Sequence, residues 1–274
     1  MKLFKSRKTS ALMSSPYIAW ATIFIIIPLC MVIYYGITDS NGHLTFDNIT
    51  TIAKPGYLKA LIRSVELALI STLVCFILAY PLGMILAGMK LKNNSYIVTL
   101  FILPMWMNFL LRTLTWMTLL EGKGVINTIL DFLHLPTMNI INTPGAIVLG
   151  MVYNFLPFMI LPIYNSLNSI DANVINAAKD LGADNLQTFL RITLPLSLPG
   201  ILSGITMVFI PALTTFAIST MLGGSKILLI GNIIEQEFTQ LYDWNLGSGL
   251  SIVLMLFILL NMIIESISSR KGDR

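Results

Sequence analysis

Charged side chains are scarce in this chain of 274 residues. They make up 11% of it and hydrophobic side chains make up 55%, whereas soluble domains carry about 25% charged residues. This imbalance excludes an ordinary water-soluble domain and predicts a protein that crosses the membrane several times. The formal net charge of +4 is too small to indicate binding to nucleic acid. Membrane lipid is therefore expected as a partner, and nucleic acid is not.

Residues suited to catalysis or metal binding are also few. The two cysteines, Cys30 and Cys75, lie inside apolar runs, which argues against a disulfide framework or a zinc site. The two histidines, His43 and His134, stand alone in predicted loops. The phosphate-binding pattern G-x-x-x-x-G-K-[ST] is absent, because the segment 122–124 lacks its spacing and its hydroxyl residue. We expect no catalytic residue, metal or cofactor in this chain, and no enzyme activity.

Long apolar runs, by contrast, recur along the whole chain. A membrane-spanning helix needs about 20 mostly apolar residues, and no alternating ten-residue pattern indicates a barrel. The first run is too long for the apolar part of a signal peptide, so we expect it to remain as a span. The expected fold is all-α, a polytopic membrane protein with six transmembrane helices, at roughly 16–38, 62–89, 95–118, 144–168, 198–222 and 245–267.

Lysine and arginine are distributed unevenly among the predicted loops. With the N-terminus inside, eleven of them fall in cytoplasmic segments and five in outer segments. Cytoplasmic loops of membrane proteins carry an excess of these residues. The distribution therefore predicts a multi-pass protein of the cell membrane with both termini in the cytoplasm. It also places the segment 169–198 in the cytoplasm.

The segment 169–198 is polar and carries signals for two short helices. Asp171 is a good N-cap, and Gly182 suits the left-handed residue that ends a helix. Asp184 and Gln187 have the spacing of a capping box, and Pro195 is expected to end the second helix. Neither helix is long enough to be stable alone in water. Their apolar faces are therefore expected to dock into a protein surface, the alternative being an amphipathic hairpin that rests on the membrane.

This segment resembles the cytoplasmic coupling loop, or EAA loop, of permease subunits of ABC importers. In that family the loop docks into the ATP-hydrolysing subunit. The family usually has glutamate where this chain has Asn176, and Asp180 lies one helical turn further on. The resemblance assigns coupling to the ATPase to Asn176, Ala177, Ala178, Leu181, Gly182, Ala183, Phe189, Leu194 and Pro195.

The same resemblance implies the architecture and partners of the whole chain. It implies a single transmembrane permease domain over 1–274, with the type I ABC-importer permease fold and a coupling loop at about 169–198. The implied partners are a dimer of ATP-binding subunits, a second permease subunit and an extracytoplasmic substrate-binding protein. The chain would then form half of the translocation path and leave ATP hydrolysis to a partner.

The third apolar run carries further polar residues, and it resembles the corresponding span of spermidine/putrescine importer permeases. Trp106, Asn108 and Arg112 are the candidate residues of the substrate path. A charge within a span is costly and indicates function, although the Arg112 side chain could instead snorkel to the interface. Glu66 is expected to pair with Arg63 one helical turn away. The outer segments are mildly acidic and contain aromatic residues, which suits a polycation.

The expected function is that of a permease subunit of an ATP-driven spermidine or putrescine importer. The alternatives within the same class are permeases for ferric iron, an aminophosphonate or an oxyanion. Oxyanions fit poorly, because Arg112 alone offers positive charge within the spans. A stand-alone secondary transporter is a further alternative. The chain lacks the paired carboxylates within spans and the inverted repeat that such a transporter would be expected to show.

Overall fold

Residues 15–89 and 103–272 are described by a computed structural model of the chain, apart from the side chains of residue 225 and residues 264–272. This part of the chain is helical, and its one β-type pairing is an isolated bridge between Thr38 and Leu44. The all-α prediction is confirmed. The helical elements are η1 (Thr22–Ile26), α2 (Ile27–Gly36), α3 (Asp47–Thr50), η2 (Thr51–Ala53), α4 (Pro55–Gly88), η3 (Leu103–Trp106), α6 (Phe109–Leu120), α7 (Val125–Phe132), α8 (Pro144–Asn168), α9 (Ala172–Asp180), α10 (Asn185–Thr188), η4 (Phe189–Thr193), α11 (Leu194–Thr214), α12 (Ala217–Gly223), η5 (Gly224–Lys226), α13 (Ile230–Thr239) and α14 (Trp244–Gly272).

Five helices in the described residues are long and apolar enough to cross a membrane. They correspond to five of the six predicted spans: Ser15–Gly36, Pro55–Gly88, Pro144–Asn168, Asn185–Thr214 and Trp244–Ile263. The remaining prediction, a helix over 95–118, falls partly outside the described residues. A six-span count is therefore not established by these five helices.

The described part of the third predicted span is broken rather than continuous. A short 3₁₀ helix ends at Trp106, and a new α-helix, α6, begins at Phe109. Between them the Asn108 side chain accepts hydrogen bonds from the backbone N–H groups of Leu110 (2.9 Å) and Leu111 (3.3 Å). Asparagine is among the best N-cap residues because its side chain satisfies these free donors. The described part of the predicted span 95–118 is therefore interrupted at this cap.

The fifth predicted span, 198–222, is displaced toward the N-terminus. The helix is continuous from Asn185 to Thr214, and Pro195 lies in the first turn of its α11 part, after the π-type turn η4. The expectation that Pro195 ends a helix is wrong. The proline nitrogen cannot donate a backbone hydrogen bond, and the π-type turn η4 before it accommodates this missing bond without ending the helix.

The predicted end of that span near residue 222 is also wrong. α11 stops at Thr214, and α12 begins at Ala217. The Phe216 carbonyl accepts a hydrogen bond from the Asn232 side-chain amide at 3.1 Å. A side chain distant in sequence thus satisfies a backbone group near the break, which an apolar pattern alone does not reveal.

The described residues form two compact units. One comprises the chain up to Tyr57 together with Ile234–Phe257, and the other comprises Leu58–Ile233 with the residues from Ile258 onward. We call them the smaller unit and the main unit. The prediction of a single permease domain remains a prediction.

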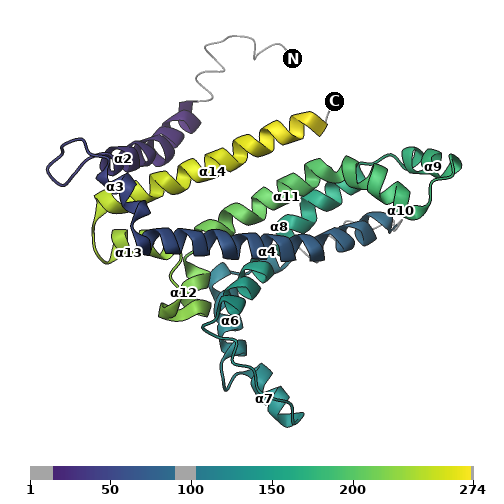
Figure 1. Cartoon of the computed structure of the whole chain (residues 1–274), viewed down its shortest axis with the longest axis horizontal. Helices are drawn as coiled ribbons and strands as arrows, with labels where there is room; N and C mark the ends of the chain where they lie inside the picture. Colours follow the sequence, from purple (N-terminus) through teal and green to yellow (C-terminus); the bar gives the residue numbers. More distant parts are fainter. Residues whose placement is uncertain (1–14, 90–102, 273–274) are drawn as a thin grey trace. The chain divides into compact units, whose positions relative to one another are not determined.

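In the main unit, α8 packs along α11 (Figure 1). Two glycines allow the helices to approach closely. A Cβ on Gly200 would lie 2.5 Å from the Pro162 carbonyl oxygen, and one on Gly204 would lie 2.7 Å from the Met159 sulfur. Small residues four positions apart let membrane helices approach in this way. α4 contacts α8 as well, where the Ser71 hydroxyl lies 3.3 Å from the Met151 sulfur.

In the smaller unit, the chain after α2 is held to the start of α14. The Asn245 side-chain amide donates to the carbonyls of Thr38 (2.6 Å) and Tyr35 (3.1 Å). Asn48 donates to the same Thr38 carbonyl at 2.8 Å. A Cβ on Gly249 would lie 2.6 Å from that of Asn48. These contacts fix the loop after α2 against α14 within this unit.

Candidate coupling site

The first helix of the segment 169–198, which we call the coupling segment, has a capped N-terminus. The Asp171 carboxylate accepts a hydrogen bond from the Asn173 backbone N–H at 2.9 Å. This bond satisfies one of the donors that every helix start leaves free. The helix α9 then runs from Ala172 to Asp180. The predicted N-cap is confirmed.

The end of α9 is a Schellman motif centred on Gly182. The Ala183 N–H donates to the Ala178 carbonyl at 3.0 Å, and the Gly182 N–H donates to the Lys179 carbonyl at 2.9 Å, which are the two bonds that define this motif. Gly182 has a φ of 88°, a left-handed value that strains residues with a Cβ. A Cβ added there would meet nothing within 4 Å. The need for glycine is therefore conformational rather than steric.

The second helix of the coupling segment starts with the predicted capping box. The Asp184 carboxylate accepts from the Gln187 backbone N–H at 2.6 Å, and the Gln187 side chain accepts from the Asp184 N–H at 3.4 Å. The chain then passes from α10 through η4 into α11 as one helix. The helix α10 is therefore the N-terminal end of a long helix that is predicted to span the membrane. A displacement of α10 would be passed directly to α11.

Tyr80 of α4 links the coupling segment to another predicted span. Its ring meets Phe189 edge-on at a centroid distance of 5.9 Å, a contact that contributes about 0.5–1.5 kcal/mol beyond its buried area. Its hydroxyl is hydrogen-bonded to the Ser197 hydroxyl at 2.9 Å. Sequence reasoning missed Tyr80, because it lies in an apolar run with no motif around it. It assigned no role to Ser197, although that residue lies in the segment 169–198.

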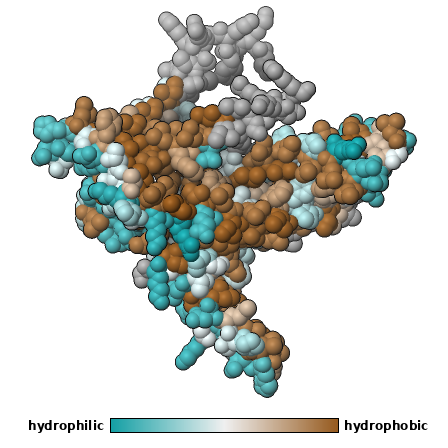
Figure 2. Space-filling view, in the orientation of Figure 1, coloured by the Kyte–Doolittle hydropathy of each residue, from teal (hydrophilic) through white to brown (hydrophobic). Residues whose placement is uncertain are grey.

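Apolar side chains of the coupling segment are exposed. Leu181 is 90% exposed and Leu186 65% exposed, and Val174 and Leu190 are also exposed, whereas Ala178 is buried. Figure 2 shows hydrophobic residues among hydrophilic ones in the region of α9 and α10. Clustered exposed apolar residues mark interaction surfaces. Of the other predicted coupling residues, Asn176, Ala177 and Pro195 are exposed, and Ala183, Phe189 and Leu194 are partly buried.

The three predicted path residues have three different environments. Trp106 is 79% exposed, and the Asn108 side chain is engaged in the helix cap. Arg112 is buried, and its Nε and Nη1 atoms have no hydrogen-bond partner. Snorkelling to solvent does not describe an arginine whose side chain is covered. The three residues therefore do not share one environment.

Asn154 of α8 is a further buried polar residue close to this region. Its amide donates to the Gly150 carbonyl at 2.8 Å and contacts the Thr113 hydroxyl at 3.4 Å. Its Oδ1 atom is buried without a partner. A buried acceptor and the buried donors of Arg112, the neighbour of Thr113, are both costly unless a further group satisfies them. The only sequence signal for Asn154 is an amide within an apolar run.

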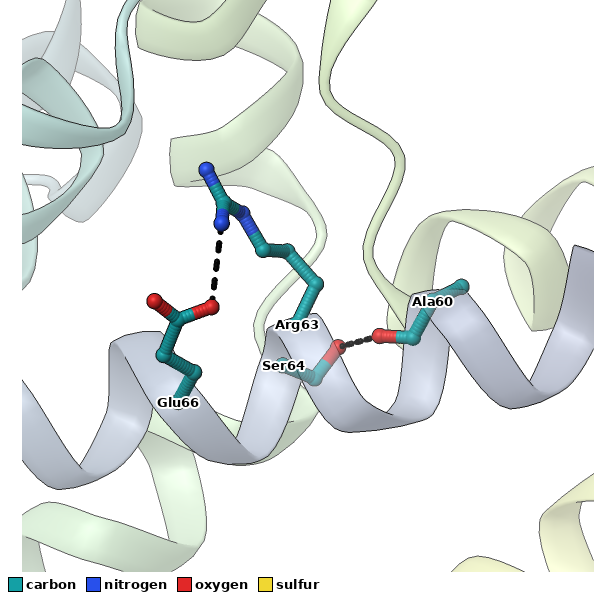
Figure 3. Close-up of polar contacts among 4 residues, drawn as sticks. All are labelled: Ala60, Arg63, Ser64 and Glu66. Atoms are coloured by element: carbon teal, nitrogen blue, oxygen red, sulfur yellow. Dashed lines mark hydrogen bonds and ion pairs between the residues drawn. The ribbon is translucent and has the colours of Figure 1, made fainter.

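Glu66 forms the predicted ion pair with Arg63. The Glu66 carboxylate lies 3.0 Å from the Arg63 guanidinium, as Figure 3 shows, and the two side chains are 48% and 41% exposed. The neighbouring Ser64 hydroxyl donates to the Ala60 carbonyl at 2.9 Å. Exposed pairs of this kind contribute about 0–1 kcal/mol. The pair is therefore a local surface contact.

The sequence of the chain decides its family. A family model described as "Binding-protein-dependent transport system inner membrane component" matches residues 4–270. The chain belongs to this family. It is therefore a multi-pass membrane protein and a permease component of an importer, and the predicted type I ABC-importer permease fold is confirmed.

A curated relative agrees with membership of this family, and solved structures share the fold. The chain is 36% identical over 261 residues to the spermidine/putrescine transport system permease protein PotB of Escherichia coli K12, covering 92% of this chain and 95% of that protein. Its fold is similar to that of a bacterial ABC transporter involved in the import of the acidic polysaccharide alginate, with a TM-score of 0.81, 19% identity and 99% of each chain covered. A second structure, of the alginate transporter with its pentasaccharide-bound periplasmic protein, has a TM-score of 0.79, 18% identity and coverage of 99% of this chain and 98% of that chain.

Proposed function

We propose that this chain is a permease subunit of an ATP-driven polyamine importer and couples, through the segment 169–198, to a separate dimer of ATP-binding subunits. The observation that carries coupling is the exposed apolar surface of α9 and α10 on a rigidly capped scaffold. Short amphipathic helices that expose apolar residues are suited to docking in a groove of another protein. The chain itself performs no ATP hydrolysis.

The structure suggests how movement of the ATP-binding subunits would reach the spans. α9 is fixed at both ends by Asp171 and Gly182, so it can move as a rigid body. α10 is continuous with α11, which packs closely on α8, and the Tyr80 contacts connect it to α4. Displacement of the coupling segment would therefore shift three spans together. This is a rigid-body route between inward-facing and outward-facing states.

The proposed topology and partners follow from the lysine and arginine bias and the family. Both termini lie in the cytoplasm, as does the coupling segment. A second permease subunit completes the translocation path, and an extracytoplasmic binding protein delivers the solute. The exposed apolar faces of the described spans suit contact with lipid and with that second permease.

The proposed substrate class is spermidine or putrescine. Its support is the identity of 36% to a protein named as a spermidine/putrescine permease over nearly the whole chain. Trp106, Asn108 and Arg112 are proposed to belong to the substrate path or its contact with the second permease. The unpartnered donors of Arg112 favour the second of these roles, because a buried cation that must be neutralised suits an acidic group of the other subunit.

The test is reconstitution of the chain in liposomes with its second permease and ATP-binding subunits. We expect ATP hydrolysis and uptake to be stimulated by a binding protein loaded with spermidine or putrescine. Stimulation by a ferric-iron or oxyanion binding protein would contradict the substrate and leave the class intact. Uptake without any ATP-binding subunit would contradict the class.

A further inference from the structure

The smaller unit contains a pocket that the proposed coupling mechanism does not use. Its volume is about 480 Å³, and its lining includes Tyr35, Tyr242, Asp243 and Trp244. These residues come from the end of α2 and from the turn between α13 and α14. Aromatic rings and a carboxylate thus meet around one open cavity.

The aromatic part of this pocket is held in place by packing. The Tyr35 and Trp244 rings have a centroid distance of 6.4 Å, and Trp244 also meets Phe238 edge-on at 5.6 Å. Tyr242 is 71% exposed and has a φ of 55°. A left-handed conformation at a residue other than glycine is costly and is often maintained at a binding site. Tyr242 is thus held at the pocket although its ring gains little from burial.

Negative charge is concentrated beside these rings. Glu237 is only 5% exposed. Burial raises the pKa of Glu237 above its ordinary value, and the neighbouring Asp243 raises this pKa further. The Tyr57 hydroxyl lies close enough to lower the pKa of this carboxyl group in part. Asp243 also caps α14, accepting from the Leu246 N–H at 2.9 Å.

No cation of the described residues neutralises these carboxylates. The single salt bridge within the described ranges joins Arg63 and Glu66. The same part of the chain contains no group of three or more His, Cys, Asp or Glu residues arranged to hold a metal ion. Aromatic faces with one carboxylate favour an organic ammonium group over a bare metal ion.

We propose that this pocket binds a terminal ammonium group of a polyamine, with the Asp243 carboxylate as its counter-ion and the Tyr242, Trp244 and Tyr35 rings around its alkyl chain. This inference rests on the proposed function and adds to it a site on the outer side of the membrane. Cations lie within about 6 Å of an aromatic ring centroid in such complexes. The long-range attraction of Glu237 adds to that of Asp243.

The test is isothermal titration of spermidine into the purified complex of both permeases and the ATP-binding subunits, without ATP and without binding protein. Asp243→Asn removes the charge but keeps an excellent helix cap. We expect it to weaken spermidine binding about tenfold, the equivalent of one charged contact. Asp131→Asn, which removes an exposed carboxylate from α7 in the main unit, is the matched control and should bind as the parent does.

Two further arms test the aromatic part and the charge of the ligand. Tyr242→Leu should weaken binding, whereas Tyr242→Phe should retain it, because both replacements experience the same backbone strain and only one keeps the ring. An uncharged diol of the same length as putrescine should not bind. Equal affinity of Asp243→Asn and Asp131→Asn for spermidine would overturn the proposed pocket.

The source of the ammonium group is tested separately. A lysine side chain of the binding protein has the same chemistry as a free polyamine. If Asp243→Asn weakens docking of the binding protein and leaves titration with spermidine unchanged, the polyamine site is wrong. Polyamine uptake by the parent complex together with that result would leave the proposed function standing. Absence of polyamine uptake, with uptake of another solute, would instead contradict the function itself.

Discussion

The coupling segment and the segment 103–120 have similar local structure, but they differ in whether polar or apolar side chains are buried. Each contains a short helix that begins at a side-chain cap, Asp171 in one and Asn108 in the other. In α9 of the coupling segment the polar residues Asn173, Asn176 and Lys179 are exposed, and the nearby Leu181 and Leu186 are exposed as well. In α6 the polar residues Arg112 and Thr113 are buried, and several leucines are exposed instead.

This difference shows what each segment requires from its surroundings. Water satisfies the polar face of α9, so only its apolar side chains need a partner, which we propose to be a protein surface. The exposed leucines of α6 can pack against lipid or another span. What α6 lacks is a polar group that can pair with Arg112. The first need predicts an ATP-binding subunit, and the second predicts a contact with the second permease or the substrate path.

The largest expected effect is that of Gly182→Val. A β-branched residue at the left-handed position costs about 1–2 kcal/mol, enough to misdirect α10 without unfolding the spans. We expect normal membrane insertion but at least about tenfold loss of association with the ATP-binding subunit, together with loss of uptake. Pull-down of that subunit and an uptake assay measure both effects.

Gly182→Asn is the matched control for that substitution. Asparagine tolerates the left-handed conformation better than any β-branched residue, so this variant should retain most of the association. Asn176→Glu, which introduces the residue usual in the family, should be tolerated or strengthen it. Normal binding and uptake by Gly182→Val would remove the conformational argument for α9.

Replacement of Arg112 should have the next largest effect. Methionine has a similar length and no buried charge to satisfy, so Arg112→Met should leave thermal stability of the isolated chain in detergent unchanged or raise it by about 1–4 kcal/mol. Uptake by the assembled transporter should nevertheless fall. Arg112→Lys should lower uptake less than Arg112→Ala. Unchanged uptake in all three variants would show that the buried guanidinium has no partner in the assembly.

The two helix caps should have smaller and separable effects. Asp171→Ala and Asn108→Ala should each destabilise their helices by about 1 kcal/mol, whereas Asp171→Asn and Asn108→Asp should be close to the parent. Limited proteolysis of the purified chain should reveal the loss at α9. Cleavage of Asp171→Ala and Asp171→Asn at the same rate would contradict a stabilising role of the Asp171 cap in α9.

The smallest effect is expected for Arg63→Gln. The Arg63–Glu66 pair is exposed, so its loss should change the free energy of unfolding by about 0–1 kcal/mol. A thermal melt at low and high salt checks this value. A larger loss at low salt would show that the pair contacts another charged group.

The sequence predicted the local features of the coupling segment well. Asp171, Gly182 and the Asp184 capping box form hydrogen bonds with residues at most five positions away. The spacing of residues in the sequence is therefore enough to predict them. The expected Arg63–Glu66 pair has the same local character. Five apolar runs also corresponded to helices of the required length, since length and hydrophobicity largely determine a span.

Features that depend on distant residues were not predicted. The Asn232 side chain donates a hydrogen bond to the Phe216 carbonyl, next to the break after Thr214. Tyr80 contacts Phe189 across more than one hundred positions, and Asn154 reaches Thr113 between helices. Hydrophobic periodicity does not encode such contacts, because they arise only when the spans pack.

Cysteine labelling at position 181 tests docking of the coupling segment most directly. Leu181→Cys, made in a Cys30→Ser background because Cys30 is exposed and Cys75 is buried, places a thiol where the native side chain is 90% exposed. Leu135→Cys, at an exposed position after α7, is the control. We predict that a membrane-permeant maleimide labels both sites in the chain alone, and that adding the ATP-binding subunit protects position 181 only. Equal labelling of position 181 with and without that subunit, in a complex that still imports its solute, would contradict the coupling mechanism.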